Sequence, residues 1–309
     1  MKIAVVGPGA MGCLVAALVA NKTKEEVWLV DRDDDRAKKI RSRGIIVEGI
    51  SGSMKVPVRT TADPREAGES DLVIICTKSY STEEACKKIV SMVGARTSIM
   101  TLQNGVGNVQ TISENFDPDK VVCGVTSHGA TLLDVGHVRH AGKGDTIIGR
   151  PDGRVTLPLR TIQTMLTRAG FATKVSKNIE SIVWSKLIIN VGINALTAVT
   201  MLHNGMLIEY PGTKEIMRDA VSEAVKIAKR KKRKLIYDDP IQKVESVGKA
   251  TATNISSMLQ DVLKKKKTEI DYINGAIVRH GKSLSIPTPV NSVLTNLVKT
   301  IESSYDKRL

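Results

Sequence analysis

Residues 178–201, NIESIVWSKLIINVGINALTAVTM, predict one long helix around which the C-terminal part of the chain is organised. Asn178 suits its N-cap. Apolar side chains cover most of its circumference, so we expect the helix to be largely buried. Within it, Lys186, Asn190 and Asn194 recur every four residues and therefore line one face in a row.

A buried cation normally needs a charged or polar partner, because losing its hydration is expensive. This row of one ammonium group and two carboxamides, walled by aliphatic side chains, suits a small, oxygen-rich anion. The alternative is a helix whose lysine and asparagine side chains cap or bridge neighbouring loops.

The hydrophobic pattern differs on the two sides of residue 178. Up to residue 177, short apolar strands alternate with helices, which predicts an α/β fold with a Rossmann-type doubly wound, mostly parallel sheet over residues 1–177. Residues 178–309 show only helical patterns, which predicts a second, all-α domain. The expected strands are 2–6, 27–30, 45–48, 54–60, 71–77, 97–102, 121–125, 137–140, 146–148 and 172–175. The expected helices are 10–20, 33–43, 82–92, 158–168, 178–201, 213–234, 240–247, 254–266, 269–281 and 289–303.

The length of 309 residues leaves room for two domains, and the hydrophobic content of 41% is ordinary for a globular protein. No apolar run reaches the roughly 20 residues that span a bilayer. The N-terminal residues lack the regions of a signal peptide. We therefore expect a cytoplasmic protein with no membrane partner.

Much of the net charge of +14 lies in two runs, Lys229–Lys234 (KRKKRK) and Lys264–Lys267 (KKKK). Such runs can bind nucleic acid. The chain offers only two Trp, five Tyr and two Phe for base stacking, and it has no recognised nucleic-acid motif. Solvated helix faces are therefore the favoured interpretation, and no nucleic-acid partner is expected.

The cysteines and histidines do not predict a metal site. The four cysteines have no metal-binding spacing and lie in or beside apolar runs. Cys86, beside two lysines on a predicted helix, is expected to be the most exposed of them, with an inert thiol favoured. His128, His137 and His140 lack a supporting carboxylate spacing, so we interpret them as polar loop residues.

The first strand leads into GPGAMG, which matches the dinucleotide fingerprint GxGxxG after a strand and at the start of a helix. Its glycines permit a tight turn, a close approach to a pyrophosphate and close packing of the helix on the sheet. The helix N-terminus adds unpaired N–H groups that favour phosphate. The predicted cofactor contacts are Gly7, Pro8, Gly9, Ala10, Met11 and Gly12. A glycine turn without a ligand is the alternative.

Asp31 ends the second strand, where a carboxylate accepts hydrogen bonds from the adenosine ribose hydroxyls of NAD. Arg32 and Arg36 follow directly, and either could approach the 2′-phosphate of NADP. The pattern favours NADH through Asp31 and leaves NADPH open through Arg32.

Several stretches together resemble ketopantoate reductase (2-dehydropantoate 2-reductase), the NAD(P)H-dependent family of pantothenate and coenzyme A synthesis. They cover nearly the whole chain. The most specific are GPGAMG at 7–12, CTKSY at 76–80, LQNG at 102–105, WSKLIINVGINAL at 184–196 and NISSMLQDVLKKKKTEIDYINGAI at 254–277. Related dehydrogenases of 6-phosphogluconate and 3-hydroxy acids share the architecture, including the type of helical C-terminal domain, but not the last block.

The resemblance implies reduction of 2-dehydropantoate to (R)-pantoate in a cleft between the two domains. It makes Lys186 and Glu269 catalytic. The residues that it assigns to the substrate are Asn104, Asn190, Asn194, Asn254 and Ser257. It also places Lys78 and Asn104 at the rim of the cofactor cleft. Asp31 departs from the family pattern, since NADP-preferring members commonly carry a basic residue there.

The chemistry of these residues agrees with the resemblance. Hydride delivered to a C2 carbonyl builds negative charge on its oxygen, which a nearby cation stabilises and can protonate. Lys186, in an apolar helix, should have a lowered pKa that eases proton donation. Two roles fit Glu269: a bond to the 4-hydroxyl of the substrate opposite Lys186, or the first-turn acid of a helix capped by Thr268.

The other candidates also have local alternatives. Asn254 and Ser257 are three residues apart and would share one helix face, or Asn254 would be the N-cap of that helix. Asn104 and Lys78 each follow the C-terminal end of a predicted strand, where ligands bind in open α/β sheets. Either could instead satisfy loop carbonyls.

Three functions fit these residues to different degrees. A reductase with an anionic ketoacid substrate uses all of them. A non-catalytic dinucleotide sensor or nucleic-acid partner has no need for Lys186, Asn190, Asn194 and Glu269 together. The same chemistry on another hydroxy acid or an imine is disfavoured by the block at 254–277. The apolar helices of the second domain suit a homodimer.

Overall fold

The computed structural model describes residues 1–307 and divides the chain into two compact units. The first, here called the sheet unit, comprises residues 1–103 and 107–179. The second, here called the helical unit, comprises residues 104–106 and everything from residue 180 onward. Three residues from within the N-terminal part of the chain therefore pack with the helical unit, which the change of hydrophobic pattern near residue 178 did not indicate.

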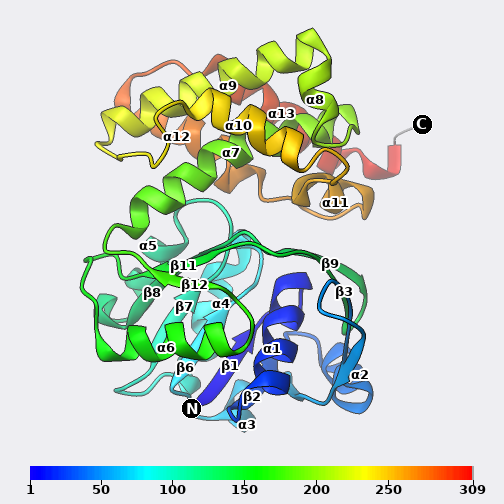
Figure 1. Cartoon of the computed structure of the whole chain (residues 1–309), viewed down its shortest axis with the longest axis vertical. Coiled ribbons are helices and arrows are strands. Elements are labelled where there is room, and N and C mark those ends of the chain that lie inside the picture. The colour runs from blue at the N-terminus through cyan, green and yellow to red at the C-terminus, as the bar shows by residue number, and fades with distance from the viewer. Residues whose placement is uncertain (308–309) are drawn as a thin grey trace. The chain divides into compact units, whose positions relative to one another are not determined.

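The sheet unit is built on eight strands, seen in Figure 1. Their order is β12 (Thr173–Val175), β11 (Thr146–Gly149), β8 (Val121–Thr126), β7 (Ser98–Thr101), β6 (Leu72–Ile75), β1 (Lys2–Val6), β2 (Glu26–Val30) and β5 (Arg59–Thr61). All neighbours are parallel except β8 and β11. The predicted doubly wound, mostly parallel sheet is confirmed. The carboxyl ends of its parallel strands meet at one edge, where ligands bind in such folds.

Helix α1 (Ala10–Lys22) lies against the large sheet and also contacts a second, four-stranded sheet. The order of this second sheet is β4 (Met54–Val56), β3 (Ile45–Gly49), β10 (His137–Gly142) and β9 (Gly129–Asp134). Because α1 is covered on both sides, Gly12–Val19 are all buried. The predicted strand 54–60 is wrong: Pro57 has no N–H to continue a ladder, so β4 joins the small sheet and β5 the large one. Strand β9 was not predicted.

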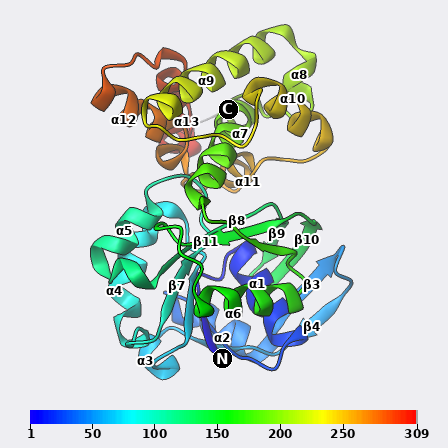
Figure 2. The same ribbon diagram turned by 60° about the vertical axis from the view of Figure 1, so that its left-hand side comes forward.

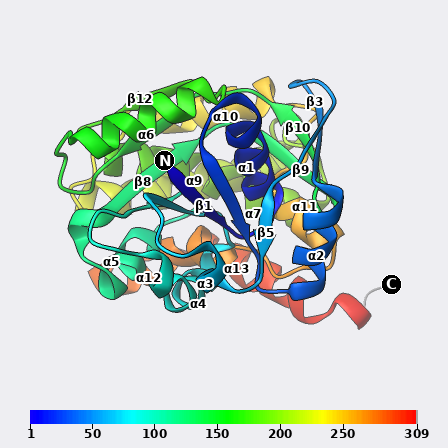
Figure 3. The ribbon, with the colours of Figure 1, turned by 90° about the horizontal axis from the view of Figure 1, so that it is seen from below.

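Helices cover both faces of the large sheet, as Figures 2 and 3 show. One apolar core contains α1 and α6 (Leu157–Arg168), and the other lies beneath α3 (Pro64–Ala67), α4 (Thr82–Lys88) and the unpredicted α5 (Asn108–Asn115). Helix α2 (Asp34–Arg43) packs beside β5. Cys86 lies in the second core and is fully buried, so its predicted exposure is wrong. Burial raises the pKa of its thiol to about 11, as expected of an inert thiol.

The helical unit is organised around α7 (Ile179–Thr200), as predicted. The other helices are α8 (Met206–Glu209), α9 (Pro211–Arg230), α10 (Pro240–Ala250), α11 (Ser257–Leu263), α12 (Asn274–Leu284) and α13 (Pro289–Ser303). By length and composition alone α7 could cross a membrane, contrary to the expectation that no run would qualify. However, 67% of its most apolar window is buried inside the structure, so α7 is the core helix of this unit.

Four predicted helices are too long. The predicted helix 82–92 ends with α4 at Lys88, and a 3₁₀ turn, η2 (Ile89–Met92), follows it. Helix α9 ends at Arg230, and Lys232 has a positive φ of 56°, so most of the run at 229–234 lies in a turn. Helix α11 spans only Ser257–Leu263, so the four exposed lysines at 264–267 also follow a helix rather than cover one. The segment after Glu269 forms a short 3₁₀ turn, η4 (Ile270–Tyr272), before α12 begins. Both basic runs are largely exposed to solvent, as expected, but they lie mostly in the turns and loops that follow α9 and α11 rather than on helix faces.

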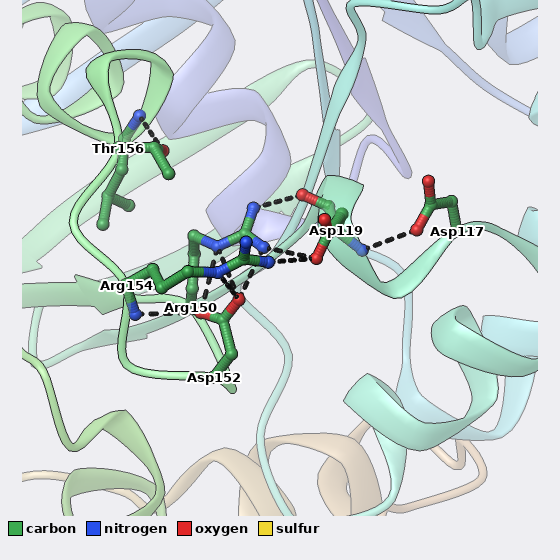
Figure 4. A network of polar contacts seen from close by, with 7 residues as sticks. Asp117, Asp119, Arg150, Asp152, Arg154 and Thr156 are labelled. Atoms are coloured by element: carbon green, nitrogen blue, oxygen red, sulfur yellow. Dashed lines mark hydrogen bonds and ion pairs between the residues drawn. The ribbon is translucent and has the colours of Figure 1, made fainter.

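An ion-pair cluster joins the start of β8 to the end of β11, as seen in Figure 4. The Arg150 side chain is 8% exposed, and its guanidinium pairs with Asp152 at 2.7 Å and with Asp119 at 2.9 Å. Arg154 pairs with the same two carboxylates. Arg150 holds the pKa of Asp152 well below its usual range. Every charge in this cluster faces an opposite charge.

Candidate active site

The glycine loop between β1 and α1 has the geometry of a phosphate-binding turn. Gly7 has a φ of 98°, and a Cβ there would lie 2.8 Å from Thr77 Cγ2. A Cβ on Gly12 would lie 2.0 Å from the Gly7 carbonyl oxygen. Gly9 is the N-cap of α1 and supplies no side-chain cap, while a Cβ there would meet no protein atom within 4 Å. The loop therefore leaves room beside Gly9, at the N-terminus of α1, which fits a dinucleotide pyrophosphate.

Asp31 lies at the carboxyl end of β2, where the ribose was expected, but its carboxylate is already engaged. It is 3% exposed. Its Oδ1 accepts from the backbone N–H of Arg32 at 2.7 Å, and Arg36 donates to both oxygens, with Nε 2.9 Å from Oδ2. Arg32 instead points its guanidinium towards Glu84 at 3.5 Å, with both side chains exposed. Sequence reasoning noted Arg36 only as a phosphate contact and missed this ion pair.

Lys78 follows β6 at the same edge of the sheet and is half-buried. Its loop is held by Gln103, whose Nε2 donates to the Thr77 carbonyl at 3.0 Å and to Thr82 Oγ1 at 2.9 Å. Gln103 was not predicted as a site residue. Its position directly after a strand, beside Asn104, was the signal that could have identified it.

Lys186, Asn190 and Asn194 lie in a row on one face of α7, which is continuous from Ile179 to Thr200. Lys186 and Asn190 are half-buried, and Asn194 is 5% exposed. Burial lowers the pKa of Lys186 to about 8, because an ammonium group loses hydration there, and the Glu269 carboxylate acts in the opposite direction. The predicted lowering of this pKa is confirmed. An amine with such a pKa holds its proton at neutral pH and releases it readily.

Glu269 is 5% exposed and immediately precedes the η4 turn. The capping role falls to Thr268, whose Oγ1 accepts from the backbone N–H of Ile270 at 3.1 Å. The Glu269 side chain makes no capping bond to the turn. Its carboxylate is near enough to raise the pKa of Lys186, so the helical unit brings the two predicted catalytic residues together.

Asn104 belongs to the helical unit, although it follows a strand of the large sheet. The next two residues explain this position. Gly105 has a φ of 78°, and a Cβ there would lie 2.3 Å from the Tyr272 carbonyl oxygen. The backbone N–H of Val106 donates to the same oxygen at 3.2 Å. Asn104 is therefore held beside the segment that carries Glu269.

Asn254 and Ser257 are exposed and do not share a helix face, because α11 begins only at Ser257. The expectation that Asn254 caps this helix is also wrong. Ser256 is the N-cap, and its Oγ accepts from the Leu259 N–H at 3.1 Å. Ser256 Oγ also lies 2.6 Å from Thr197 Oγ1 on α7, so the loop carrying Asn254 is bonded to that helix. With two adjacent serines, the sequence did not indicate which one turns inward.

His128 lies in the loop between β8 and β9, as expected, whereas His137 and His140 lie on strand β10. His128 and His140 are buried, with stacked rings whose nitrogens Nδ1 and Nε2 lie 2.9 Å apart. His140 also contacts Ser51 Oγ at 2.6 Å through Nδ1. Burial lowers the pKa of His128 to about 4. Among residues 1–307 no group of three or more His, Cys, Asp or Glu residues is arranged to hold a metal ion.

This fold and these residues define a class of protein: a dinucleotide-dependent oxidoreductase with a glycine-loop sheet unit and a helical unit carrying a half-buried lysine beside a buried glutamate. Comparison with known proteins makes the class specific. Residues 3–153 match the family described as ketopantoate reductase PanE/ApbA, and residues 178–302 match its C-terminal counterpart. The chain belongs to the ketopantoate reductase family.

Individual relatives agree with this assignment. The 2-dehydropantoate 2-reductase of Pyrococcus horikoshii is 36% identical over 98% of each chain, and that of Halobacterium salinarum is 33% identical over 97% of this chain and 98% of its own. A solved ketopantoate reductase from Ralstonia eutropha superposes with a TM-score of 0.91 at 32% identity, covering 99% of this chain and all of its own. A D-mandelate dehydrogenase solved with NADH and anilino(oxo)acetate reaches a TM-score of 0.93 at 26% identity, over the full length of both chains.

Proposed function

We propose that this protein reduces 2-dehydropantoate to (R)-pantoate with NADH or NADPH, and that Lys186 is the proton donor. The observation that carries the proposal is the row of Lys186, Asn190 and Asn194 on α7, in which burial lowers the pKa of Lys186 to about 8 and Glu269 of the same unit only partly opposes that shift. The names of relatives that match over almost their whole length support the substrate.

The bound nicotinamide would supply a hydride to the C2 carbonyl carbon. Lys186 Nζ would stabilise the negative charge that grows on the carbonyl oxygen and then transfer its proton to it. Glu269 would keep Lys186 charged before the reaction and accept a hydrogen bond from the substrate's hydroxyl group. A separate set would bind the anion through carboxamide and hydroxyl groups: Asn104, Asn190, Asn194, Asn254 and Ser257.

The direct test is steady-state oxidation of NADH and NADPH on addition of 2-dehydropantoate. Turnover should saturate in the ketoacid and produce (R)-pantoate, identified by chiral chromatography. A protein that binds NADH but oxidises it with none of the ketoacids offered would be a sensor, and the proposal would be wrong.

A second candidate, an aryl hydroxy-acid dehydrogenase, is favoured by the fold similarity to D-mandelate dehydrogenase. The two reactions share the hydride and proton transfers and differ in the group beside the carbonyl. A panel containing 2-dehydropantoate and 2-oxo-2-phenylacetate separates them. We expect kcat/KM to be higher for 2-dehydropantoate, and the opposite order would favour the second candidate.

For the cofactor, the Asp31–Arg36 pair supports use of both dinucleotides. Asp31 Oδ2 accepts one hydrogen bond from Arg36, which leaves an acceptor site for a ribose hydroxyl of NADH. The Arg36 side chain is 42% exposed, and turning away from Asp31 would bring its cation to a 2′-phosphate. Arg36→Leu should raise KM for NADPH more than for NADH, and Asp31→Ala should do the reverse. Equal changes for both cofactors would remove this pair from cofactor selection.

We also propose that the protein is a cytoplasmic homodimer with no nucleic-acid or membrane partner. Exposed apolar side chains on α13, Val293 at 57% and Leu297 at 44%, support an interface between copies. Light scattering in solution tests the dimer, and a monomeric mass at micromolar concentration would contradict it.

A further inference from the structure

A hydrogen-bonded series of buried polar side chains, here called the polar network, crosses the helical unit. The proposed reaction does not use it directly. Asn274 and Asn291 are both fully buried, and Glu223 is 7% exposed. Asn274 Nδ2 donates to Asn291 Oδ1 at 3.0 Å, and Asn291 Nδ2 donates to a carboxylate oxygen of Glu223 at 2.7 Å. Among the buried polar atoms of these three side chains, Asn274 Oδ1 alone lacks a hydrogen-bond partner. The bonded amide donors still each select one acceptor and therefore favour one arrangement.

The two ends of the polar network bond to different elements. Glu223, on α9, accepts the backbone N–H groups of Val290 at 2.9 Å and Asn291 at 3.0 Å, so it caps α13. At the other end, Asn274 Nδ2 donates to the main-chain carbonyl of Val191 on α7 at 3.1 Å. Val191 directly follows Asn190 and lies five residues after Lys186.

Asn274 is also connected to Glu269 through a compact piece of main chain. The N–H of Tyr272 donates to the Glu269 carbonyl at 2.9 Å, and that of Ile273 donates to the Ile270 carbonyl at 3.2 Å. Glu269 and Asn274 therefore begin and end one folded turn. The hydrogen bond from Asn274, at the end of the turn, to the Val191 carbonyl therefore fixes where the turn lies along α7.

Two other directional contacts of the turn go to segments other than α7: the Tyr272 carbonyl accepts from the Val106 N–H at 3.2 Å, and Asp271 pairs with Lys299 on α13 at 2.6 Å. Towards α7, apart from the charge of Glu269 near Lys186, the turn otherwise offers apolar packing. Ile270 and Ile273 are each 1% exposed and pack in the apolar core with α7. Apolar packing is strong but non-directional, whereas a buried amide bonded to one main-chain carbonyl selects one register.

We propose that Asn274 is a positioning residue for catalysis, which holds the turn bearing Glu269 at a fixed place along α7 relative to Lys186. The inference rests on the proposed function for its kinetic consequence. The geometric part, that Asn274 sets the distance between Glu269 and Lys186, stands apart from any substrate.

The test compares two variants, one at each end of the polar network. Asn274→Leu keeps the approximate side-chain size and removes both donors. Glu223→Gln weakens the cap of α13 without touching the turn or α7, and so controls for general destabilisation. Both should lower Tm, but only Asn274→Leu should lower kcat, by about 10- to 100-fold as expected for misplaced catalytic groups. KM for the ketoacid should change less than kcat.

A second measurement does not depend on turnover. Competitive acetylation with acetic anhydride over a pH series, read by peptide mass spectrometry, reports the pKa of Lys186. Glu269 raises that pKa, so its displacement in Asn274→Leu should lower the pKa by about half a unit or more. Glu223→Gln should leave it at the parent value.

An unchanged Lys186 pKa and kcat in Asn274→Leu would overturn the proposal, as would equal changes in Glu223→Gln. If Asn274→Leu does not fold, Asn274→Ser, which keeps one donor, should show smaller shifts in the same direction, and no shift would be decisive against it. A parent protein that fails to reduce 2-dehydropantoate would contradict the proposed function alone, because the acetylation experiment would still decide the positioning role.

Discussion

Arg150 in the sheet unit and Lys186 in the helical unit are both cations with limited access to water, but their pKa values are shifted in opposite directions. Arg150 meets two carboxylates at 2.7 and 2.9 Å, and its pKa is raised, chiefly by hydrogen bonding to Asp152. Lys186 has its pKa lowered to about 8, because burial outweighs the influence of Glu269.

The difference separates a structural charge from a reactive one. An arginine surrounded by carboxylates has no reason to release a proton and serves to join β8 to β11. A lysine whose desolvation is only partly compensated is less stable as a cation, which is the property a proton donor needs. Between these two cations, the lowered pKa distinguishes Lys186 from Arg150, and the position of Lys186 in a row with Asn190 and Asn194 makes it the candidate catalytic group.

The largest expected effect is on turnover. Lys186→Ala should lower kcat for ketoacid reduction by about 10²- to 10⁴-fold, because it removes the proton donor. NADH binding, measured by fluorescence titration, should stay close to that of the parent, since the glycine loop is unchanged. Turnover within tenfold of the parent would identify another donor.

The charge and the proton of Lys186 can be separated with Lys186→Arg. Arginine keeps the positive charge but does not release a proton in this pH range. We expect kcat to remain far below the parent value. Recovery of most of the activity would mean that the cation acts only by electrostatic stabilisation.

The second prediction concerns pH. Lys186 must be protonated to act as an acid, so kcat should be level below about pH 7 and fall as the pH rises through about 8. Because Glu269 raises this pKa, Glu269→Gln should move the fall to lower pH. A pH profile of kcat at saturating substrate checks both points, and a fall displaced to higher pH in Glu269→Gln would contradict the assigned influence.

The third prediction concerns Arg150, the structural cation of the comparison. Asp152→Ala leaves the Arg150 guanidinium with Asp119 as its remaining carboxylate, and should lower the free energy of unfolding by about 1–3 kcal/mol while leaving kcat unchanged. The pKa of Asp152 is depressed in the folded state, so its contribution is present at neutral pH and is lost as the pH falls below the ordinary aspartate range. Urea unfolding at pH 7 and at about pH 3, below the ordinary aspartate pKa of 3.8, should show a smaller difference between variant and parent at the lower pH.

The smallest effect is expected for a charge that is neither buried nor reactive. Lys266 is exposed in the run at 264–267 and is bonded through its main chain: its N–H donates to the Asp261 carbonyl at 2.9 Å, and its carbonyl accepts from the Tyr305 hydroxyl at 2.8 Å. Lys266→Gln should change the free energy of unfolding by less than about 0.5 kcal/mol and leave kcat unchanged. A larger loss, measured by urea unfolding, would show that the basic run has a structural role.

Local sequence patterns predicted much of this fold. The continuous apolar strands, the glycine fingerprint at 7–12 and the 22-residue helix at 179–200 each depend on neighbours in sequence, and the structure has them where they were expected. The errors also have local causes that were not weighed. Pro57 splits a strand, and Ser256 rather than Asn254 caps α11.

The sequence alone determined that Lys186, Asn190 and Asn194 share a face and that a lysine in this apolar helix would have a lowered pKa, because helix period and desolvation are local properties. Only the tertiary structure decided which charge lies near which. Glu269 acts on Lys186, and Asn104 joins the helical unit through Tyr272. These pairings join segments whose meeting depends on the packing of whole elements, which no periodicity in the chain records.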